Sequence, residues 1–521
     1  MNLQQRASGV LLHISSLPGP NGIGDFGPDA QHFVDWLQGC GQRIWQWLPT
    51  TPIGPGDSPY QSVSAFAGSP LMVALEPLVA KGWLPEWPAA PSAAQVWPDG
   101  RVNFARVVPW RLQQLRAAAA GYAQHAGAAD RAALAAWVQA PAQRDWLDDY
   151  SLFMAIETAQ AGQPWWCWPE PLRHRDARAL DQVRAQQAAE IAFWQFVQWQ
   201  FDTQCAELKS YANQRGVAIM GDLPIFVAHH SADCWARPDL YLLDEHSQPT
   251  VVAGVPPDDL GPMGQRWGNP LYRWDRMAAE GYAWWTARVR RMLTQADVFR
   301  IDHFRGFAGY FEIPASSPDA TTGRWLPGPG QALFDAIAQA LGPLPIVAED
   351  LGFITSDVHA LREGCGFPGM KILQFAFGGG GEHEFLPHSY ERNVVAYTGT
   401  HDNDTALGWW RGASERERRF AGSYLACGEH DVHWAMLRVV LNSVANIAVF
   451  PLQDVMGLAG EHRMNIPGTL GGSNWTWRFD WPQLGHEPGR VLGLLTAASG
   501  RGPFSLLGVG DAPAPAAPAV Y

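Results

Sequence analysis

Short hydrophobic runs, many of them rich in β-branched residues, recur along the chain, and most are followed by a loop and then by a helical pattern. Apolar residues at successive positions are typical of strands buried on both faces, and strands that alternate with helices favour a parallel sheet. Eight such runs predict a closed (β/α)₈ TIM barrel, an α/β fold. We expect these strands at 7–14, 43–49, 216–225, 298–304, 345–351, 370–377, 393–402 and 446–454.

Two stretches are too long to be simple connections between strands. Between the second and third strands, Ala-rich helical patterns such as RLQQLRAAAAGYAQHA predict a mainly helical insertion at about 76–200. After the third strand, a segment rich in Pro, Gly and Asp predicts an irregular insertion at about 227–275. The barrel would then span 1–510, and the Ala/Pro-rich tail 511–521 is expected to be disordered.

Composition narrows the class of protein. The formal net charge of −13, without any Lys/Arg-rich run, argues against a nucleic-acid surface. The chain holds 26 Trp, whose flat apolar faces suit sugar rings as well as a protein core. Its six Cys lie far apart with no CxxC pair, which indicates a reducing compartment and neither disulfides nor a zinc module. With no signal peptide and no membrane span in the pattern, we expect a soluble, cytoplasmic protein without membrane partners.

Acidic residues stand at the carboxyl ends of five predicted strands. In a TIM barrel this rim carries the active site. Because unpaired buried carboxylates are costly, acids gathered there indicate chemistry, with a structural ion-pair network as the alternative. The acids are Asp222, Asp302, Glu349, Asp350, Asp402 and Asp454.

Two chemistries fit such a rim. Metal-assisted hydrolysis would draw ligands from HDND (401–404) and HH (229–230), but no HExxH pattern supports it. As strand neighbours, His401 and Asp402 are also expected to point to opposite faces. Cleavage of a glycosidic bond by two carboxylates is the other chemistry, and the one we favour. We therefore expect no metal and no cofactor.

The roles of the two carboxylates follow from their surroundings. Arg300 lies two residues before Asp302 on the same strand face, and a nearby cation keeps a carboxylate ionised, as a nucleophile requires. Glu349, among the apolar residues of IVAEDL, is expected to stay protonated by desolvation and to act as the general acid. Neighbouring strands allow the separation of about 5–5.5 Å that retaining enzymes use.

Several long motifs make the family recognisable. GDLPIF (221–226), FRIDHFRG (299–306), AEDLG (348–352) and TGTHDND (398–404) occur in the order of the four conserved regions of the α-amylase superfamily. The residues of these motifs resemble those of the 4-α-glucanotransferases, as do four further segments: SPYQSVSAFAGSP (58–70), AGVPPD (253–258), GQRWGNPLY (264–272) and MNIPGT (464–469). These enzymes, also called amylomaltases or disproportionating enzymes, form glycoside hydrolase family 77. The resemblance runs from about residue 7 to 480.

The resemblance implies a role for each matching residue. Asp302 would be the nucleophile, Glu349 the acid/base, and Asp402 the carboxylate that holds sugar hydroxyls. It also implies a TIM barrel with inserted subdomains, the second of them covering the cleft, and no C-terminal β-sandwich. The implied substrate-binding residues are Tyr60, stacked under the sugar at the cleavage point, Asp222 and Arg300 in the same subsite, His303 and His401 as donors to hydroxyls, and Gln265 and Trp267 on the acceptor side.

The leading hypothesis is a 4-α-glucanotransferase that moves α-1,4-glucan segments by a retaining double displacement. The alternative is a retaining α-glucan hydrolase, because the three carboxylates Asp302, Glu349 and Asp402 would serve hydrolysis and transfer equally. A non-catalytic glucan-binding protein would not need all three acids. The sequence leaves open donor and acceptor length, the ratio of transfer to hydrolysis, and whether the oligomeric state is a monomer or a weak dimer. Many relatives carry an aromatic residue where this chain has DLGPMG (259–264), so the sequence does not decide whether large cyclic glucans are made. It also does not decide whether Trp165, Trp166 and Trp168 contact glucan or pack in the core.

Overall fold

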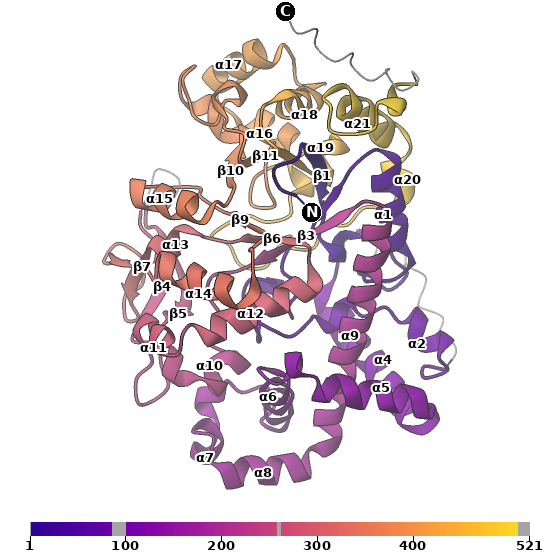
Figure 1. The fold of residues 1–521 in the computed structure, drawn as a ribbon, viewed down its shortest axis with the longest axis vertical. Helices are drawn as coiled ribbons and strands as arrows, with labels where there is room; N and C mark the ends of the chain where they lie inside the picture. Colours follow the sequence, from indigo (N-terminus) through magenta and orange to yellow (C-terminus); the bar gives the residue numbers. More distant parts are fainter. Residues whose placement is uncertain (1, 86–99, 258–261, 509–521) are drawn as a thin grey trace, which may run out of the picture.

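Eight parallel strands form a nearly closed barrel at the centre of the molecule (Figure 1). The structure is a computed structural model, and it describes residues 2–85, 100–257 and 262–508. The strands pair in the order β10-β11-β12-β1-β2-β3-β6-β9. They are β1 (Ala7–Leu11), β2 (Ile44–Gln46), β3 (Ala218–Leu223), β6 (Val298–Ile301), β9 (Ile346–Ala348), β10 (Gly369–Ile372), β11 (Val394–Tyr397) and β12 (Ile447–Pro451).

The predicted TIM barrel is confirmed, because each of the eight expected segments contributes one barrel strand. Every residue of β1 and of β12 is buried, which accounts for the continuous apolar runs, since these strands face the barrel interior on one side and helices on the other. The helices that flank the barrel are α1 (Pro28–Gly39), α9 (Ala188–Gln214), α12 (Ala283–Gln295), α14 (Gln331–Leu341), α15 (Ser356–Cys365), α16 (Ala406–Gly412), α17 (Glu415–Leu425), α18 (Val432–Asn442) and α21 (Glu487–Ala498).

The strands end earlier than the hydrophobic pattern predicts. The strand expected at 370–377 stops at Ile372 and continues as a 3₁₀ helix over Leu373–Gly378, and the one expected at 446–454 passes into α19 (Leu452–Val455). A short apolar run does not separate a buried strand from a buried helix, so these ends are wrong in the prediction. The residues beyond the strand ends form the rim that carries the acids.

The long stretch before β3 is helical, and it lies in the lower part of Figure 1. Residues 86–99 of the expected insertion lie outside the described residues. Its described helices are α2 (Glu76–Ala80), α4 (Phe104–His125), α5 (Ala128–Gln139), α6 (Leu147–Ala159), α7 (Glu170–Arg173) and α8 (Ala177–Gln186).

A second, antiparallel sheet lies beside the barrel, and the sequence did not predict it. Two of its strands, β4 (Val251–Val255) and β5 (Gln265–Pro270), fall within 227–275, where irregular structure was expected. They pair in the order β5-β4-β7-β8 with β7 (Gly309–Pro314) and β8 (Arg324–Pro327), which follow β6. The pairing joins segments far apart in the chain, which local pattern cannot reveal. The short helices α10 (Ala232–Ala236), α11 (Trp274–Ala279) and α13 (Arg305–Ala308) connect this sheet to the barrel.

Beyond β12 the described chain, as far as residue 508, contains the helices α19, α20 (Trp481–Leu484) and α21 and no strand. The tail 511–521 lies outside the described residues. The division of the chain into domains at the boundaries given above stays a prediction.

Candidate active site

Arg300 occupies the centre of the site. It lies in β6, directly opposite Asp222 of β3 in the sheet register. Its Nη1 donates to both oxygens of Asp222, at 2.9 and 2.8 Å, and its Nη2 donates to Oδ1 of Asp302 at 2.7 Å. The Arg300 side chain is only 5% exposed, so its charge is stabilised by these carboxylates rather than by water. The predicted pairing of Arg300 with Asp302 is confirmed, with Asp222 as a second partner.

Glu349 lies at the carboxyl end of β9, the strand next to β6. Its Oε2 accepts a hydrogen bond from the backbone N–H of His303 at 2.7 Å, and its Oε1 accepts one from Leu351 at 3.1 Å. The same Oε2 is 4.0 Å from Nη2 of Arg300. Burial raises the pKa of Glu349 to about 8, against the opposing effect of Arg300. The carboxyl group is therefore mostly protonated at neutral pH.

The backbone at His303 is strained in a way that serves Glu349. Its φ of 50° lies in the left-handed region, which is uncommon for a residue with a side chain. This conformation turns the chain just after Asp302 and directs the His303 N–H at the Glu349 carboxyl group. Strain of this kind persists where the surrounding structure enforces it, often at functional sites.

Asp402 and His401 come from the turn after β11. Oδ1 of Asp402 accepts a hydrogen bond from Nδ2 of Asn465 at 2.6 Å, and Oδ2 is 3.3 Å from Nε2 of His401. The expectation that His401 and Asp402 point to opposite faces is wrong. β11 ends at Tyr397, so the strand alternation that the expectation assumed stops before these residues. The Asp402 side chain is 40% exposed, the most accessible of the three proposed catalytic carboxylates.

Tyr60 connects Asp222 of β3 with His401, which follows β11. Its hydroxyl donates to Oδ2 of Asp222 at 2.8 Å and lies 3.0 Å from Nε2 of His401. Its ring stacks on the His401 ring, with centroids 5.3 Å apart and planes within 10°. Burial raises the pKa of the Tyr60 hydroxyl, which therefore keeps its proton at neutral pH. Burial likewise raises the pKa of Asp222, and Arg300 and Tyr60 oppose that rise.

Gln265 and Trp267 reach the site from β5 of the second sheet. Nε1 of Trp267 donates to Oε1 of Gln265 at 3.1 Å. The Trp267 ring meets the His303 ring edge-on, with centroids 4.9 Å apart. The second sheet is thereby joined to the loop that follows the proposed nucleophile.

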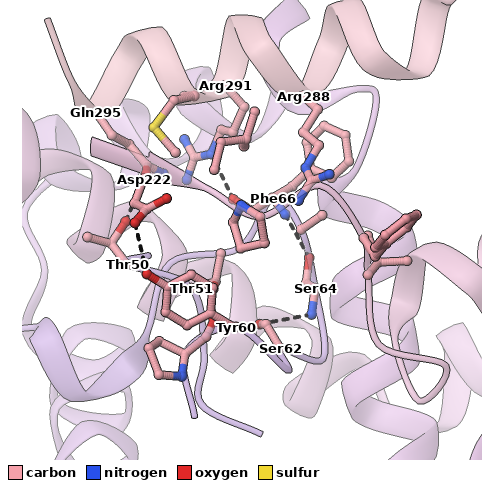
Figure 2. Close-up of a pocket in the computed structure, with 17 residues that line it drawn as sticks. Thr50, Thr51, Tyr60, Ser62, Ser64, Phe66, Asp222, Arg288, Arg291 and Gln295 are labelled. Atoms are coloured by element: carbon pink, nitrogen blue, oxygen red, sulfur yellow. Dashed lines mark hydrogen bonds between the residues drawn. The ribbon is translucent and has the colours of Figure 1, made fainter. Parts of the chain in front are cut away.

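A cavity lies behind Tyr60 and Asp222, between the 50–66 segment and α12 (Figure 2). In Figure 2 the Tyr60 hydroxyl points toward Asp222, and Arg288, Arg291 and Gln295 of α12 lie across the cavity from Tyr60. Neither Asp302 nor Glu349 lines it. The cavity therefore lies on the side of Tyr60 and Asp222 away from the two proposed catalytic carboxylates.

Two buried nitrogen atoms in the site have no hydrogen-bond partner among the described residues. They are Nε of Arg300 and Nε2 of His303. Burial lowers the pKa of His303 to about 4, so the ring is neutral at pH 7 and has one N–H donor. Buried polar atoms are normally satisfied, so these two are exceptions within the site.

Two of the acids expected at the rim do not face the cleft. Asp350 accepts a hydrogen bond from the backbone N–H of Met370, and Asp454 accepts bonds from Thr398 and from the N–H of Ala406. For these two residues the alternative of a structural network holds.

In contrast, sequence reasoning missed Asn465, although it lies in the quoted motif MNIPGT, because only the fold brings it to Asp402.

The remaining candidates for a metal or glucan contact are packed against one another. The His229 ring stacks on Trp166 at 3.9 Å, and Nε2 of His230 lies 2.8 Å from Glu157. Trp165 and Trp168 are buried, which favours core packing for both. No group of three or more His, Cys, Asp or Glu side chains in the described ranges is arranged to hold a metal ion.

Comparison with known proteins decides the family. A family model described as 4-alpha-glucanotransferase, glycoside hydrolase family 77, matches residues 12–483. The chain belongs to this family. A 4-alpha-glucanotransferase of Thermus thermophilus is 48% identical over 95% of this chain and 99% of its own length, and one of Synechocystis sp. is 44% identical over 96% and 99%. Among solved structures, the amylomaltase from Streptococcus agalactiae in complex with acarbose superposes with a TM-score of 0.90 at 35% identity, covering 96% of this chain and 100% of that one.

Membership in this family makes the chain an enzyme with 4-alpha-glucanotransferase activity. It confirms the resemblance inferred from the motifs and does not favour the hydrolase alternative. None of the helices in the described part of the chain combines the length and apolar character needed to cross a bilayer. The roles of the individual site residues stay predictions.

Proposed function

We propose that this 4-alpha-glucanotransferase uses Asp302 as nucleophile and Glu349 as acid/base to move α-1,4-glucan segments from a donor to the 4-hydroxyl of an acceptor sugar. The observation that carries the assignment is the position of both carboxyl groups around Nη2 of Arg300, at 2.7 and 4.0 Å. One group is ion-paired and the other is buried and protonated, which are the two states that a retaining mechanism needs.

Asp302 performs the first bond-forming step. Arg300 holds its Oδ1, while Oδ2 accepts no hydrogen bond from any described residue and is free to attack the anomeric carbon. The attack breaks the bond to the glycosidic oxygen and forms a β-linked glycosyl-enzyme ester. The Asp302 side chain is 29% exposed, whereas Arg300 and Asp222 are buried beneath it.

Glu349 moves the proton in both steps. Its raised pKa keeps it protonated, so that it can donate to the departing 4-oxygen of the donor. The resulting carboxylate then removes the proton from the 4-hydroxyl of the acceptor as that oxygen attacks the ester and restores the α-linkage. The N–H groups of His303 and Leu351 fix both oxygens and hold the carboxyl group in place between the steps.

The other site residues hold the sugar at the cleavage point. Asp402, kept in position by Asn465, is accessible enough to accept hydrogen bonds from sugar hydroxyls. His303 and His401 are proposed as donors to hydroxyls, and the stack of Tyr60 on His401 offers a flat face to the ring. Asp222 is buried against Arg300 and supports the subsite from below.

Transfer requires an acceptor that binds well enough to exclude water from the ester. Trp267, whose ring meets His303, and Gln265, to which Trp267 donates, are the proposed acceptor contacts. The related amylomaltase from Streptococcus agalactiae was solved in complex with acarbose, which supports α-glucan substrates for this chain. The six cysteines, all free in the structure, support the cytoplasm as the compartment.

The proposal is tested by a time course with maltotriose alone, with products separated by chain length. We expect a ladder of longer maltooligosaccharides that forms together with glucose. Glu349→Gln is the matched control, which should bind maltotriose and form no ladder. If only shorter products accumulate, with reducing ends rising in step, water is the acceptor and the proposed acceptor site is wrong. If Glu349→Gln forms the ladder at the wild-type rate, the assignment of the acid/base is wrong.

A further inference from the structure

Arg305 is the one charged residue of FRIDHFRGF that the chemistry above does not use. It lies three residues after Asp302, at the start of α13, and it is only 7% exposed. Its guanidinium carbon is 3.6 Å from the centroid of the Trp325 ring on β8 and 5.6 Å from the centroid of the Phe353 ring. A buried cation thus lies against two aromatic rings from two different segments of the rim.

Arg305 also fixes the loop that carries Phe353. Its guanidinium group donates to the carbonyl oxygen of Phe353, and the same loop is tied to the catalytic acid by the N–H of Leu351. Nε of Arg305 is buried and has no partner among the described residues. Retaining a desolvated cation with an unsatisfied N–H is costly, which indicates that the position of Phe353 matters.

Phe353 is 68% exposed in spite of this support. A single exposed apolar residue is common on protein surfaces and decides nothing alone. Phe504, for example, is 43% exposed in the short 3₁₀ helix Phe504–Leu507, which packs against α21. Phe353 differs because Arg305, which packs on Trp325, lies against its ring and donates to its carbonyl oxygen, and because it follows the proposed acid/base by four residues.

We propose that Phe353, held by Arg305, is a stacking platform for an outer glucose unit of the acceptor glucan. The inference rests on the proposed function. Glu349 protonates the departing oxygen and later deprotonates the entering one, so leaving and entering sugars lie on its side of the cleavage point. The loop that begins at Glu349 carries Phe353, and the apolar face of a glucose ring suits an exposed aromatic ring.

The test measures acceptor use separately from donor use. Unlabelled amylose serves as donor, and glucose, maltose, maltotriose and maltotetraose labelled at the reducing end serve as acceptors. For Phe353→Ala we expect kcat/KM to fall about three- to tenfold for maltotriose and maltotetraose, the loss of one stacking contact, and to stay unchanged for glucose. Phe353→Trp should restore the wild-type values. Phe504→Ala, which also removes an exposed phenylalanine, should leave all four acceptors unaffected.

Each other outcome overturns the inference in its own way. Equal losses for glucose and maltotetraose would mean that Phe353 acts on the catalytic centre, and no loss for any acceptor would mean that it contacts no sugar. If Phe353→Ala lowers kcat/KM only when a shorter unlabelled glucan replaces amylose as the donor, Phe353 contacts the donor and not the acceptor. Failure of the proposed function is recognised separately, because the wild-type enzyme would then incorporate no labelled acceptor at all.

Discussion

Glu349 and Asp350 are neighbours in the chain, and their side chains, 11% and 7% exposed, follow the end of β9. The structure uses them in opposite ways. Glu349 turns into the cleft, where it meets Arg300. Asp350 turns outward, where its Oδ1 accepts from the Met370 N–H at 2.7 Å and its Oδ2 lies 3.2 Å from Nε of Arg362. β9 ends at Ala348, so strand alternation does not set these directions. The turn after the strand does, and it brings Glu349 to Arg300 and Asp350 to Arg362.

The position of Asp350 explains how the barrel closes. β9 and β10 stand at the two ends of the strand order and share no ladder. The N–H of Ala348 donates to the carbonyl oxygen of Pro368, and the Asp350 carboxylate supplies the next contact across the gap. Gly369 leaves room for it, because a Cβ at that position would lie 2.4 Å from Asp350 Oδ2. A buried acid at the rim is therefore not by itself a sign of catalysis.

The largest difference between the two acids is expected in turnover. Glu349→Gln should lower the initial rate on maltotriose about a thousandfold, because proton transfer to and from the glycosidic oxygen is lost. Asp350→Asn should cause a much smaller loss, since it can act only through the position of Glu349. Initial rates of the two variants at equal concentrations of folded enzyme make the comparison. Equal losses would show that the two acids share one function.

For stability, the change at Asp350 is expected to have a larger effect than the change at Glu349. Asp350→Ala should lower the free energy of unfolding by about 3–5 kcal/mol, because the buried Arg362 guanidinium and the Met370 N–H lose their partner. Gly369→Ala, which pushes a methyl group against the same carboxylate, should change stability in the same direction. Urea unfolding followed by circular dichroism measures both, with Glu349→Gln as the control that stays folded. A stable Asp350→Ala variant would mean that the barrel closes without this contact.

The smallest expected effect concerns pH. Glu349 has an ordinary pKa of 4.5, and burial raises the pKa to about 8 in the folded chain. Between these values the folded state binds more protons than the unfolded state, so stability decreases as the pH rises. Glu349→Gln removes this decrease. The variant should match the wild type near pH 4 and exceed its free energy of unfolding by about 1–3 kcal/mol above pH 8. A difference that is constant with pH would show that folding does not oppose the ionisation of Glu349.

Much of this arrangement could be predicted from local sequence. The eight apolar runs predicted the barrel because buried parallel strands leave a nearly continuous hydrophobic pattern. The pairing of Arg300 with Asp302 followed from a separation of two residues on one strand. The protonated state expected for Glu349 followed from its apolar neighbours, and burial in the structure accounts for its raised pKa.

The sequence by itself determined the barrel, the family and the charged pair on one strand, because these depend on periodicity and on motifs of adjacent residues. Only the tertiary structure decided which acids face the cleft, how β4, β5, β7 and β8 form a second sheet, and why Asn465 and Tyr60 reach Asp402 and Asp222. These contacts join residues that are far apart in the chain. Their geometry depends on where each strand stops and how the chain turns, which hydrophobic periodicity does not encode.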